Sequence, residues 1–385
     1  MGARGAAGDG ASRARGETAE LRVVMVCPYD LSRPGGVQGQ ATGLARALRR
    51  SGHDVVVVAP GSRPRGWATP DVYVAGRSVG VRANGSLAPV SLSVAAGARA
   101  WRAAAVWCPD VVHLHEPLAP VLGYGFLASR RWPMVGTFHR AGAGALYRLA
   151  SPVARAAARR VDVRCAVSAV ARDTAAAVCG GTYEVLFNGV DLDRHGSARA
   201  TGTDVPAVLF LGRHEPRKGL GVLLEAFSRL ERPAVLWVAG AGPETARLRA
   251  RHPESPRVHW LGVVSDGEVA SRLAGASVLC APSLGGESFG MVLVEAMAAR
   301  CRVVASDIDG YREVAGGHAL LVPPGDAGAL AAALDRALGG PPDAAALDEA
   351  AAHAAGWSMD ALAARYVDLY RRAIAARDRP RAAVT

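Results

Sequence analysis

The chain has 385 residues, of which half are apolar and 5% are aromatic, and its formal net charge at pH 7 is +11. This length is sufficient for two domains with separate hydrophobic cores. The composition is typical of a soluble globular protein, and because no run of 18 or more apolar residues occurs, we predict no transmembrane helix.

The amino terminus and the cysteines indicate the compartment. The first 20 residues contain three arginines and three acidic residues but no apolar segment. They predict a disordered tail over residues 1–20 and argue against a secretory signal. Six cysteines are scattered along the chain without a CxxC pair, which argues against structural zinc and is typical of a reduced, cytoplasmic protein.

The positive charge is concentrated in the first half of the chain. Residues 21–190 contain 20 arginines and 8 acidic residues, whereas residues 191–385 contain 22 basic and 23 acidic residues. The first half is therefore expected to meet an anionic partner. The scarcity of aromatic residues disfavours nucleic acid, whereas an anionic inner-membrane surface fits this charge.

Short β-branched runs alternate with stretches rich in Ala and Leu along the chain. Near-continuous apolar strands separated by helices indicate buried parallel sheets. Two series of such strands predict an α/β protein with two doubly wound, Rossmann-like domains. The first series covers 22–27, 54–59, 110–115, 134–139 and 163–168. The second covers 207–212, 234–240, 257–262, 277–282 and 302–307.

The domain boundary is expected near 187–206, where Gly, Asp, Thr and Pro replace the apolar pattern. A final amphipathic helix, capped by a serine, follows the second series. The predicted organisation is a first domain over 21–190, a second over 191–355, a terminal helix over 356–378 and a disordered tail over 379–385.

Two loops that follow strands contain adjacent glycines and run into helices. One is PGGVQ at 34–38, and the other lies in PSLGGESFGMVLVEAMA at 282–298. Ligands of open parallel sheets bind beyond the carboxyl ends of strands, where glycine lets backbone amides approach a phosphate. The first loop does not match GxGxxG, which disfavours an NAD-dependent oxidoreductase.

The segment GRHEPRKGL at 212–220 contains Lys218, the only lysine among 45 basic residues. Lysine presents a compact point charge, whereas arginine presents a flat fork of donors. A tight site for a diphosphate oxygen favours lysine, while an exposed turn accommodates either base.

Six motifs occur in order: PGGVQ (34–38), HEP (115–117), TFH (137–139), NGVD (188–191), LGRHEPRKG (211–219) and GGESFGMVLVEAMA (285–298). Together they resemble glycosyltransferase family 4, most closely its bacterial phosphatidylinositol α-mannosyltransferases. The resemblance covers about residues 21–372. It implies a retaining enzyme of the GT-B fold, with an acceptor-binding first domain and a donor-binding second domain facing each other across a cleft. It also implies a last helix that returns to the first domain.

The resemblance implies a donor site in the second domain. Arg213 and Lys218 would clasp the diphosphate of a nucleotide sugar, where negative charge collects as the sugar leaves. Glu287 would hold hydroxyls of the donor sugar, and Glu295, about two turns into the next helix, the ribose hydroxyls. Backbone amides at the start of that helix would meet the diphosphate, from Ser288, Phe289, Gly290 and Met291.

The first domain is expected to contribute to both ligands. Gly36 resembles the glycine whose loop closes over the diphosphate, and His139 resembles the family histidine near the donor sugar. The predicted catalytic set is Arg213, Lys218, His139 and Glu287. Candidates for acceptor binding are Gln38, Asn84, His115, Glu116 and Arg140. For His115 and Glu116 a purely structural role stays open.

No catalytic metal is predicted. Asp191 and Asp193, and likewise Asp307 and Asp309, form DxD strings, but the GT-B fold that the resemblance implies does not use such a motif. The implied mechanism retains the anomeric configuration without a glycosidase-type carboxylate pair, and the leaving phosphate is a candidate for the base.

The stretch that matches the family's lipid-docking helix, 90–107, contains only Arg99 and Arg102 as basic residues, beside Trp101 and Trp107. Interfacial helices combine a basic face with apolar anchors. A second basic segment lies at 148–164, where Arg155 and Arg159 are expected to share a face, and a solvated helix surface is the alternative for it.

The sequence therefore predicts a cytoplasmic hexosyltransferase at the inner face of the plasma membrane, moving α-mannose from GDP-mannose to a phosphatidylinositol-type lipid. The main alternative uses a UDP-sugar and a soluble acceptor such as an inositol phosphate or a glycan precursor. A sugar-nucleotide epimerase and a non-catalytic sensor are more distant alternatives. No covalently bound cofactor is expected.

Overall fold

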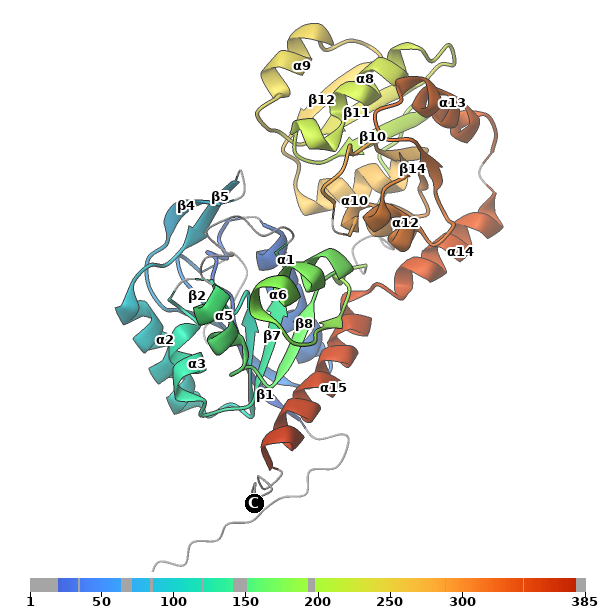
Figure 1. Ribbon diagram of the computed structural model, residues 1–385. Coiled ribbons are helices and arrows are strands. Elements are labelled where there is room, and N and C mark those ends of the chain that lie inside the picture. Colours follow the sequence, from blue (N-terminus) through green and yellow to red (C-terminus); the bar gives the residue numbers. More distant parts are fainter. Residues whose placement is uncertain are drawn as a thin grey trace, which may run out of the picture.

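The computed structural model describes residues 20–33, 35–63, 71–83, 86–119, 121–140, 151–192, 198–287, 289–341 and 343–378. These residues form two lobes, each built around one parallel sheet (Figure 1). In the first lobe the strand order is β3-β2-β1-β6-β7-β8-β9, and in the second it is β12-β11-β10-β13-β14-β15. The predicted tails, apart from Glu20, lie outside the described residues.

The first lobe alternates strands with helices from β1 to β9. Its elements are β1 (Arg22–Val26), α1 (Gly36–Arg50), β2 (Asp54–Ala59), β3 (Val72–Val74), β4 (Val79–Ala83), β5 (Ser86–Val90), α2 (Val94–Trp107), β6 (Val111–His115), α3 (Tyr124–Ser129), β7 (Met134–Phe138), α5 (Ser151–Ala158), β8 (Val163–Ala166), α6 (Ala169–Cys179) and β9 (Glu184–Val185). The strands β4 and β5 form a separate antiparallel hairpin.

The second lobe follows the same alternation. Its elements are β10 (Ala207–Leu211), the 3₁₀-helix η1 (Pro216–Lys218), α8 (Leu220–Ser228), β11 (Val235–Ala239), α9 (Thr245–Arg251), β12 (Val258–Gly262), α10 (Asp266–Gly275), β13 (Val278–Ala281), α11 (Met291–Ala298), β14 (Arg302–Ser306), α12 (Asp309–Ala315), β15 (Leu320–Val322) and α13 (Ala327–Leu338).

Both sheets are covered on their two faces, as near-continuous apolar strands require. In β1, Val23 and Met25 join one buried cluster while Val24 and Val26 join another. Successive side chains of a strand point to opposite faces, so this division shows that helices cover both sides of the sheet. In sheets covered on both faces, ligands bind beyond the carboxyl ends of the strands.

The chain crosses back to the first lobe at its end. Helix α14 (Ala344–Ala355) leaves the second lobe, and α15 (Met359–Asp378) lies along the first, as the red helices of Figure 1 show. Ser358 caps α15 by accepting a hydrogen bond from the Ala361 amide at 3.1 Å. Helix α15 packs on α1, β6, β7 and β8.

The predicted fold class is confirmed. All ten expected strands are present, with ends within two residues of the predicted ones. The strands that the sequence analysis missed are β3, β9 and β15, which are two or three residues long, and the β4–β5 hairpin. Runs this short carry no readable periodicity. Among the described residues, no helix has both the length and the apolar character needed to cross a bilayer.

Candidate active site

A cavity of about 350 Å³ lies between the two lobes at the carboxyl ends of their strands. Residues of both lobes and of the linker line it: Gly36, Val37, Gln40, His139, Val167, Asn188, Leu211, Lys218, Glu287, Phe289, Gly290, Met291, Val292 and Glu295. This is the place where open parallel sheets bind ligands. The cavity therefore brings together most of the residues that the sequence predicts for the donor site.

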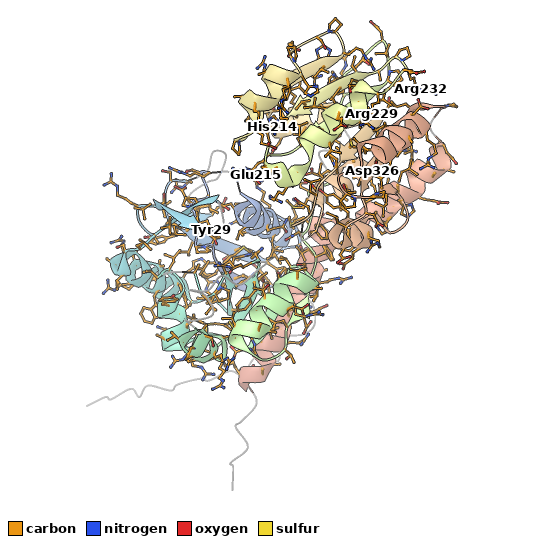
Figure 2. All side chains as sticks on the ribbon, turned by 45° about the horizontal axis from the view of Figure 1, so that its top comes forward. Tyr29, His214, Glu215, Arg229, Arg232 and Asp326 are labelled. Atoms are coloured by element: carbon orange, nitrogen blue, oxygen red, sulfur yellow. The ribbon has the colours of Figure 1, made fainter. Side chains whose placement is uncertain are left out.

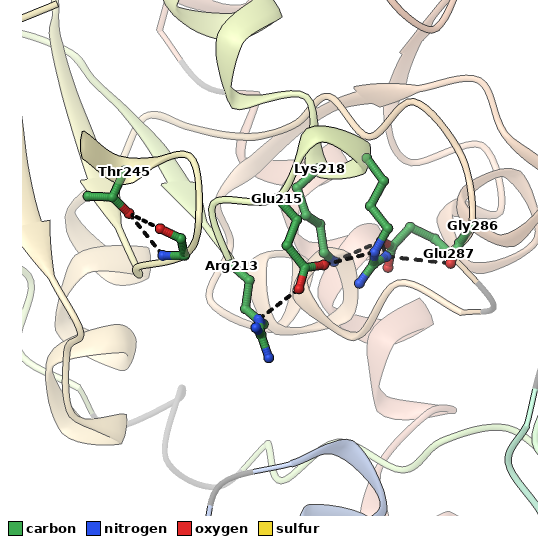
Figure 3. A network of polar contacts seen from close by, with 8 residues as sticks. Arg213, Glu215, Lys218, Thr245, Gly286 and Glu287 are labelled. Atoms are coloured by element: carbon green, nitrogen blue, oxygen red, sulfur yellow. Dashed lines mark hydrogen bonds and ion pairs between the residues drawn. The ribbon is translucent and has the colours of Figure 1, made fainter. Parts of the chain in front are cut away.

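A chain of ion pairs, here called the ion-pair network, includes Lys218 and Glu287 of the wall contributed by the second lobe and continues outside the cavity (Figure 3). Glu215 accepts from Arg213 Nε at 2.9 Å and from Arg217 Nε at 3.0 Å. Glu287 accepts from Lys218 Nζ at 2.8 Å and also from Arg217. In Figure 2, Glu215 lies at the edge of the second lobe that faces the first.

The lone lysine is the cation of the network that enters the cavity. Its side chain is 21% exposed, against 46% for Arg217 and 62% for Arg213. Lys218 lines the cavity, whereas Arg213 lies outside the lining set. The compact ammonium thus occupies the confined position, which agrees with the physical reason for lysine at this point.

Glycine makes the approach of Lys218 to Glu287 possible. Gly219 ends η1 with φ 69°, and a Cβ atom there would lie 1.9 Å from the carbonyl oxygen of Pro282. The backbone of Leu284 donates to Arg217 O at 2.7 Å, which fixes the two loops together. A side chain at position 219 would force them apart and separate the ammonium from the carboxylate.

The second glycine loop leads into α11 at the cavity floor. Gly290 precedes the helix with φ 119°, and a Cβ atom there would lie 2.8 Å from the ring of Tyr311. Glu295 lies only just over one turn inside α11, since the helix begins at Met291, so the expected depth of about two turns was wrong. Ser288 lies outside the described residues.

In the first lobe, α1 begins at Gly36, and its first turns face the cavity. Gln38, the predicted acceptor contact, is buried at 8% exposure and its amide folds back under Gly35. Gln40 lines the cavity instead. Its amide exchanges two hydrogen bonds with the linker residue Gly189, at 2.8 and 2.9 Å.

Three histidines, His113 and His115 in β6 and His139 directly after β7, extend from the cavity into the first lobe and are here called the histidine column. His139 lines the cavity, and its Nε2 lies 2.9 Å from Nδ1 of His115. The ring of His115 stacks on that of His113 at 4.4 Å. Burial lowers the pKa of His113 and His139 to about 3 and that of His115 well below its usual value. All three are therefore neutral at physiological pH.

Glu116 holds the end of β7 in place. It is buried with φ 46°, and its carboxylate accepts from the backbone amide of His139 at 2.6 Å. Burial raises its pKa, while hydrogen bonds from the backbones of His139 and Arg140 and the charge of Arg140 act against the rise. Burial raises the pKa of Tyr29, which is labelled in Figure 2, and the charge of Glu116 adds to the rise.

The remaining candidates are placed as follows. Asp307 and Asp309 both form ion pairs with Arg312, at 2.7 and 2.9 Å, on the surface of α12. Arg155 donates to the carbonyl oxygen of Val178 at 3.2 Å, and Arg159 lies beyond the end of α5. Asn84, Asp193 and Arg148 lie outside the described residues.

Four residues at the site were not singled out from the sequence: Glu215, Arg217, Gln40 and Asn188. Arg217 and Glu215 share the η1 turn with Lys218, so the motif itself contained their signal. Asn188 belongs to the NGVD motif, and its Oδ1 is buried without a hydrogen-bond partner among the described residues. A buried amide oxygen facing a cavity can accept from a ligand hydroxyl.

Two family models match the chain over both lobes. The one described as Glycosyltransferase Family 4 matches residues 34–194. The one described as Glycosyl transferases group 1 matches residues 205–339.

Relatives with a named activity match most of the chain. Phosphatidyl-myo-inositol mannosyltransferase of Mycolicibacterium smegmatis is 39% identical over 331 residues, which cover 82% of this chain and 84% of that protein. The protein of the same name from Propionibacterium freudenreichii is 35% identical over 370 residues, covering 91% of this chain and 94% of the relative.

Solved structures share the fold at lower identity. Sucrose-phosphate synthase of Thermosynechococcus elongatus superimposes with a TM-score of 0.71 at 21% identity and covers 93% of this chain and 100% of its own. Anabaena HepE in complex with UDP-glucose gives a TM-score of 0.65 at 20% identity, covering 92% and 98%. Together, the two-lobed fold, the family matches and the named relatives show that the chain belongs to glycosyltransferase family 4 and is a glycosyltransferase with the GT-B fold.

Proposed function

We propose that the protein transfers α-mannose from GDP-mannose to a phosphatidylinositol-type lipid, with retention of configuration, in the cavity between the lobes. The observation that carries the site is the confined pair of Lys218 and Glu287, 2.8 Å apart in the cavity wall. The names of relatives that are 35–39% identical over more than four fifths of the chain support mannose as the sugar and a phosphatidylinositol acceptor. GDP as the nucleotide of the donor is carried over from the family resemblance of the sequence.

The cations of the ion-pair network bind the donor diphosphate in this proposal. As the bond from the sugar C1 to the phosphate oxygen breaks, Lys218 and Arg213 stabilise the charge that collects on the diphosphate. Glu287 accepts from hydroxyls of the sugar, and Glu295 accepts from the ribose hydroxyls. The amides of Phe289, Gly290 and Met291, at the start of α11, add donors to the diphosphate, and Ser288 keeps its predicted place among them.

The first lobe supplies Gly36 and His139 on the opposite wall. The acceptor oxygen attacks C1 on the face that the diphosphate leaves, and its proton passes to the departing phosphate oxygen. His139, neutral at physiological pH, supports this step as a hydrogen-bonding group. Arg140 remains our proposed contact for an acceptor phosphate, while Gln38 and Asn84 remain predictions from the motif.

A membrane surface would bring the lipid acceptor to the first lobe. A hollow of about 580 Å³ on this lobe is lined by Arg22, Arg99, Arg102, Tyr73 and Trp107, among others. On α2, the side chains of Val94 and Val106 are 79% and 87% exposed. Cations next to exposed apolar side chains favour contact with an anionic lipid surface. We therefore propose a peripheral position on the cytoplasmic face of the membrane.

A second function, transfer from a UDP-sugar to a soluble acceptor, is favoured by one observation. The structural neighbour HepE is described in complex with UDP-glucose. In this case the cavity and the roles of Lys218 and Glu287 stay the same, and the basic hollow has no part in recruiting the acceptor.

The test is release of nucleoside diphosphate by the full chain from GDP-mannose, UDP-glucose and UDP-N-acetylglucosamine. Each donor is combined with phosphatidylinositol vesicles, with free inositol phosphate or with no acceptor. Turnover with GDP-mannose and vesicles alone, lost in Lys218→Ala, supports the proposal. Turnover with a UDP-sugar and the soluble acceptor supports the second function. Release that persists in Lys218→Ala contradicts the proposed site.

A further inference from the structure

The middle residue of the histidine column, His115, has an unpaired ring nitrogen inside the first lobe. His113 uses both ring nitrogens, bonding Tyr370 Oη and Thr137 Oγ1 at 2.8 Å each. His115 uses only Nδ1, toward His139. Its Nε2 is buried and has no partner among the described residues. The neighbouring His113 cannot supply one, because its own nitrogens are already engaged.

This asymmetry determines where the protons lie. A neutral imidazole carries one proton, so in the contact between His115 and His139 one ring donates and the other accepts. If His139 donated, His115 would carry its proton on the buried Nε2, leaving an N–H donor without an acceptor. Orphaned buried N–H groups are rare and costly, more so than under-used acceptors. The arrangement therefore favours a proton on Nδ1 of His115.

The proton position on His115 determines the proton position on His139, which lines the cavity, through the hydrogen bond between the two rings. With His115 donating from Nδ1, Nε2 of His139 accepts, so the proton of neutral His139 resides on its own Nδ1. That nitrogen forms no hydrogen bond within the described part of the chain. His139 then offers the cavity an N–H donor and no free acceptor.

We propose that His115 is a positioning residue that holds His139 in its Nδ1–H tautomer, so that His139 donates a hydrogen bond to an oxygen of the bound sugar nucleotide. The ligand class is an oxygen acceptor, a sugar hydroxyl or a diphosphate oxygen. This inference builds on the proposed function for the identity of the ligand but not for the tautomer.

The surroundings keep the column neutral. Among the described residues, Glu116 accepts from the backbone amide of His139, and the phenols of Tyr366 and Tyr370 face the column from α15. Tyr370 bonds His113 directly, and Thr137 lies between His113 and Tyr366. Tyr366 Oη lies 2.8 Å from Thr137 Oγ1, and its ring packs on His113. Burial lowers the pKa of each histidine in the column, so none carries a second proton that would make both nitrogens donors.

A fixed N–H donor also limits the chemistry of His139. The ring has no free lone pair with which to take the proton of the acceptor hydroxyl. That proton therefore has to leave by another route, and the departing phosphate oxygen is the one already proposed. His139 contributes by hydrogen bonding to charge that develops in the donor.

The test reads the tautomer directly in the full chain labelled with ¹⁵N-histidine. Long-range ¹H–¹⁵N spectra distinguish a protonated from a bare ring nitrogen, and His139→Gln identifies the signals of His139. We expect Nδ1 of His139 to be protonated and Nε2 bare in the parent protein. His115→Leu removes the donor and should mix the two tautomers, whereas His115→Asn, with an amide donor near the same position, should restore the parent pattern.

Tyr370→Phe is the matched control for damage to the fold. It removes a bond of His113 and leaves the contact between His115 and His139 intact, so the His139 tautomer should not change. For activity, kcat/KM should fall about fivefold in His115→Leu, the effect of one hydrogen bond, and recover in His115→Asn.

Any one of three results would overturn the inference. The first is a proton on Nε2 of His139 in the parent protein. The second is an unchanged His139 tautomer in folded His115→Leu, and the third is an unchanged kcat/KM in the same variant. The spectra require no donor, so they remain decisive if GDP-mannose proves to be the wrong substrate. Failure of the donor assay with the expected tautomer present would count against the proposed function alone.

Discussion

The two walls of the cavity hold their polar groups in opposite ways. In the second lobe, the ion-pair network keeps charged groups in partial contact with solvent, with Arg213 62% exposed and Glu287 13% exposed. In the first lobe, His113 and His115 are buried and His139 is half-buried where it lines the cavity, and desolvation keeps all three neutral. Partly exposed cations can exchange their carboxylate partners for the diphosphate of a donor, as we propose. Neutral histidines linked by hydrogen bonds instead fix the direction in which each ring donates.

The largest expected effect comes from removing the confined cation of the network. Lys218→Ala should lower kcat for transfer by roughly 10²–10³-fold, because a preorganised charge at the leaving group is lost. Lys218→Arg is the sharper variant, since a guanidinium keeps the charge but does not fit the position of a compact ammonium. Steady-state kinetics, with the donor that the nucleoside diphosphate release assay identifies, measure both.

Thermal unfolding separates catalysis from folding in these variants. The Lys218–Glu287 pair is partly exposed, so we expect the melting temperature of Lys218→Ala to stay close to that of the parent protein. Full activity in Lys218→Arg would show that the charge alone matters and that the compact shape does not.

The next largest effect is expected from a change in the turn that holds Lys218. Gly219→Ala places a methyl group against the carbonyl oxygen of Pro282 at a backbone φ of 69°. The variant should lose about 1–3 kcal/mol of stability, together with much of the transfer activity. Gly221→Ala, two residues on in α8, meets only Leu248 at an ordinary 3.6 Å and is the matched control. Equal melting temperatures of the two variants would contradict the close packing of η1.

The walls also differ in how far they could be predicted from the sequence. The alternation of apolar strands and the glycine loops predicted both sheets and the position of the cavity. The motif at 211–219 is local, so Arg213 and Lys218 were found together, whereas Glu287 was found in a second motif and its role was implied by the family resemblance. The pairing of His113 with Tyr370 joins residues 257 positions apart. No local pattern contains such a contact, because it exists only after α15 returns to the first lobe.

Helix phase accounts for a smaller difference. Gln38 and Gln40 both lie in the first turns of α1, and the motif pointed to Gln38. The structure directs Gln40 toward the cavity and the linker. Residues two positions apart in a helix lie on different faces. The exact first residue of the helix therefore has to be known before one of the two glutamines can be chosen.

Lowering the pH should reduce the stability of the folded protein more through the histidine column of the first lobe than through the ion-pair network of the second. The pKa of His113 and of His139 is about 3 in the folded protein, below the usual 6.5. As pH falls below about 6.5, these histidines become protonated in the unfolded chain but stay neutral in the folded chain. The free energy of unfolding therefore decreases by up to about 1.4 kcal/mol per pH unit for each such histidine. The raised pKa of Glu116 acts in the opposite direction.

This pH dependence is measured as the melting temperature between pH 7.5 and pH 5. His113→Asn removes one histidine that stays neutral in the folded protein, so the melting temperature should fall less steeply with decreasing pH, although the variant is less stable at every pH. A decline of the same steepness in parent and variant would mean that His113 accepts a proton in the folded state.

The smallest expected effect lies on the charged wall. Glu215→Gln keeps the size of the side chain and an acceptor oxygen for one of the two arginines, Arg213 or Arg217, and removes a negative charge beside the proposed diphosphate site. Because such pairs contribute little to folding, the change in stability should be below about 1 kcal/mol. The KM for the donor should fall about two- to fivefold at low salt, and the gain should shrink as salt screens the charges.

Glu225→Gln makes the same change of charge on the exposed face of α8, where Glu225 pairs with Arg229, and should leave the KM unchanged. A rise of KM in Glu215→Gln would mean that the carboxylate aligns Arg213 for the donor rather than competing with it. In that case the second lobe, like the first, would depend on a residue that orients its neighbour, and the contrast between the two walls would lie only in their charge.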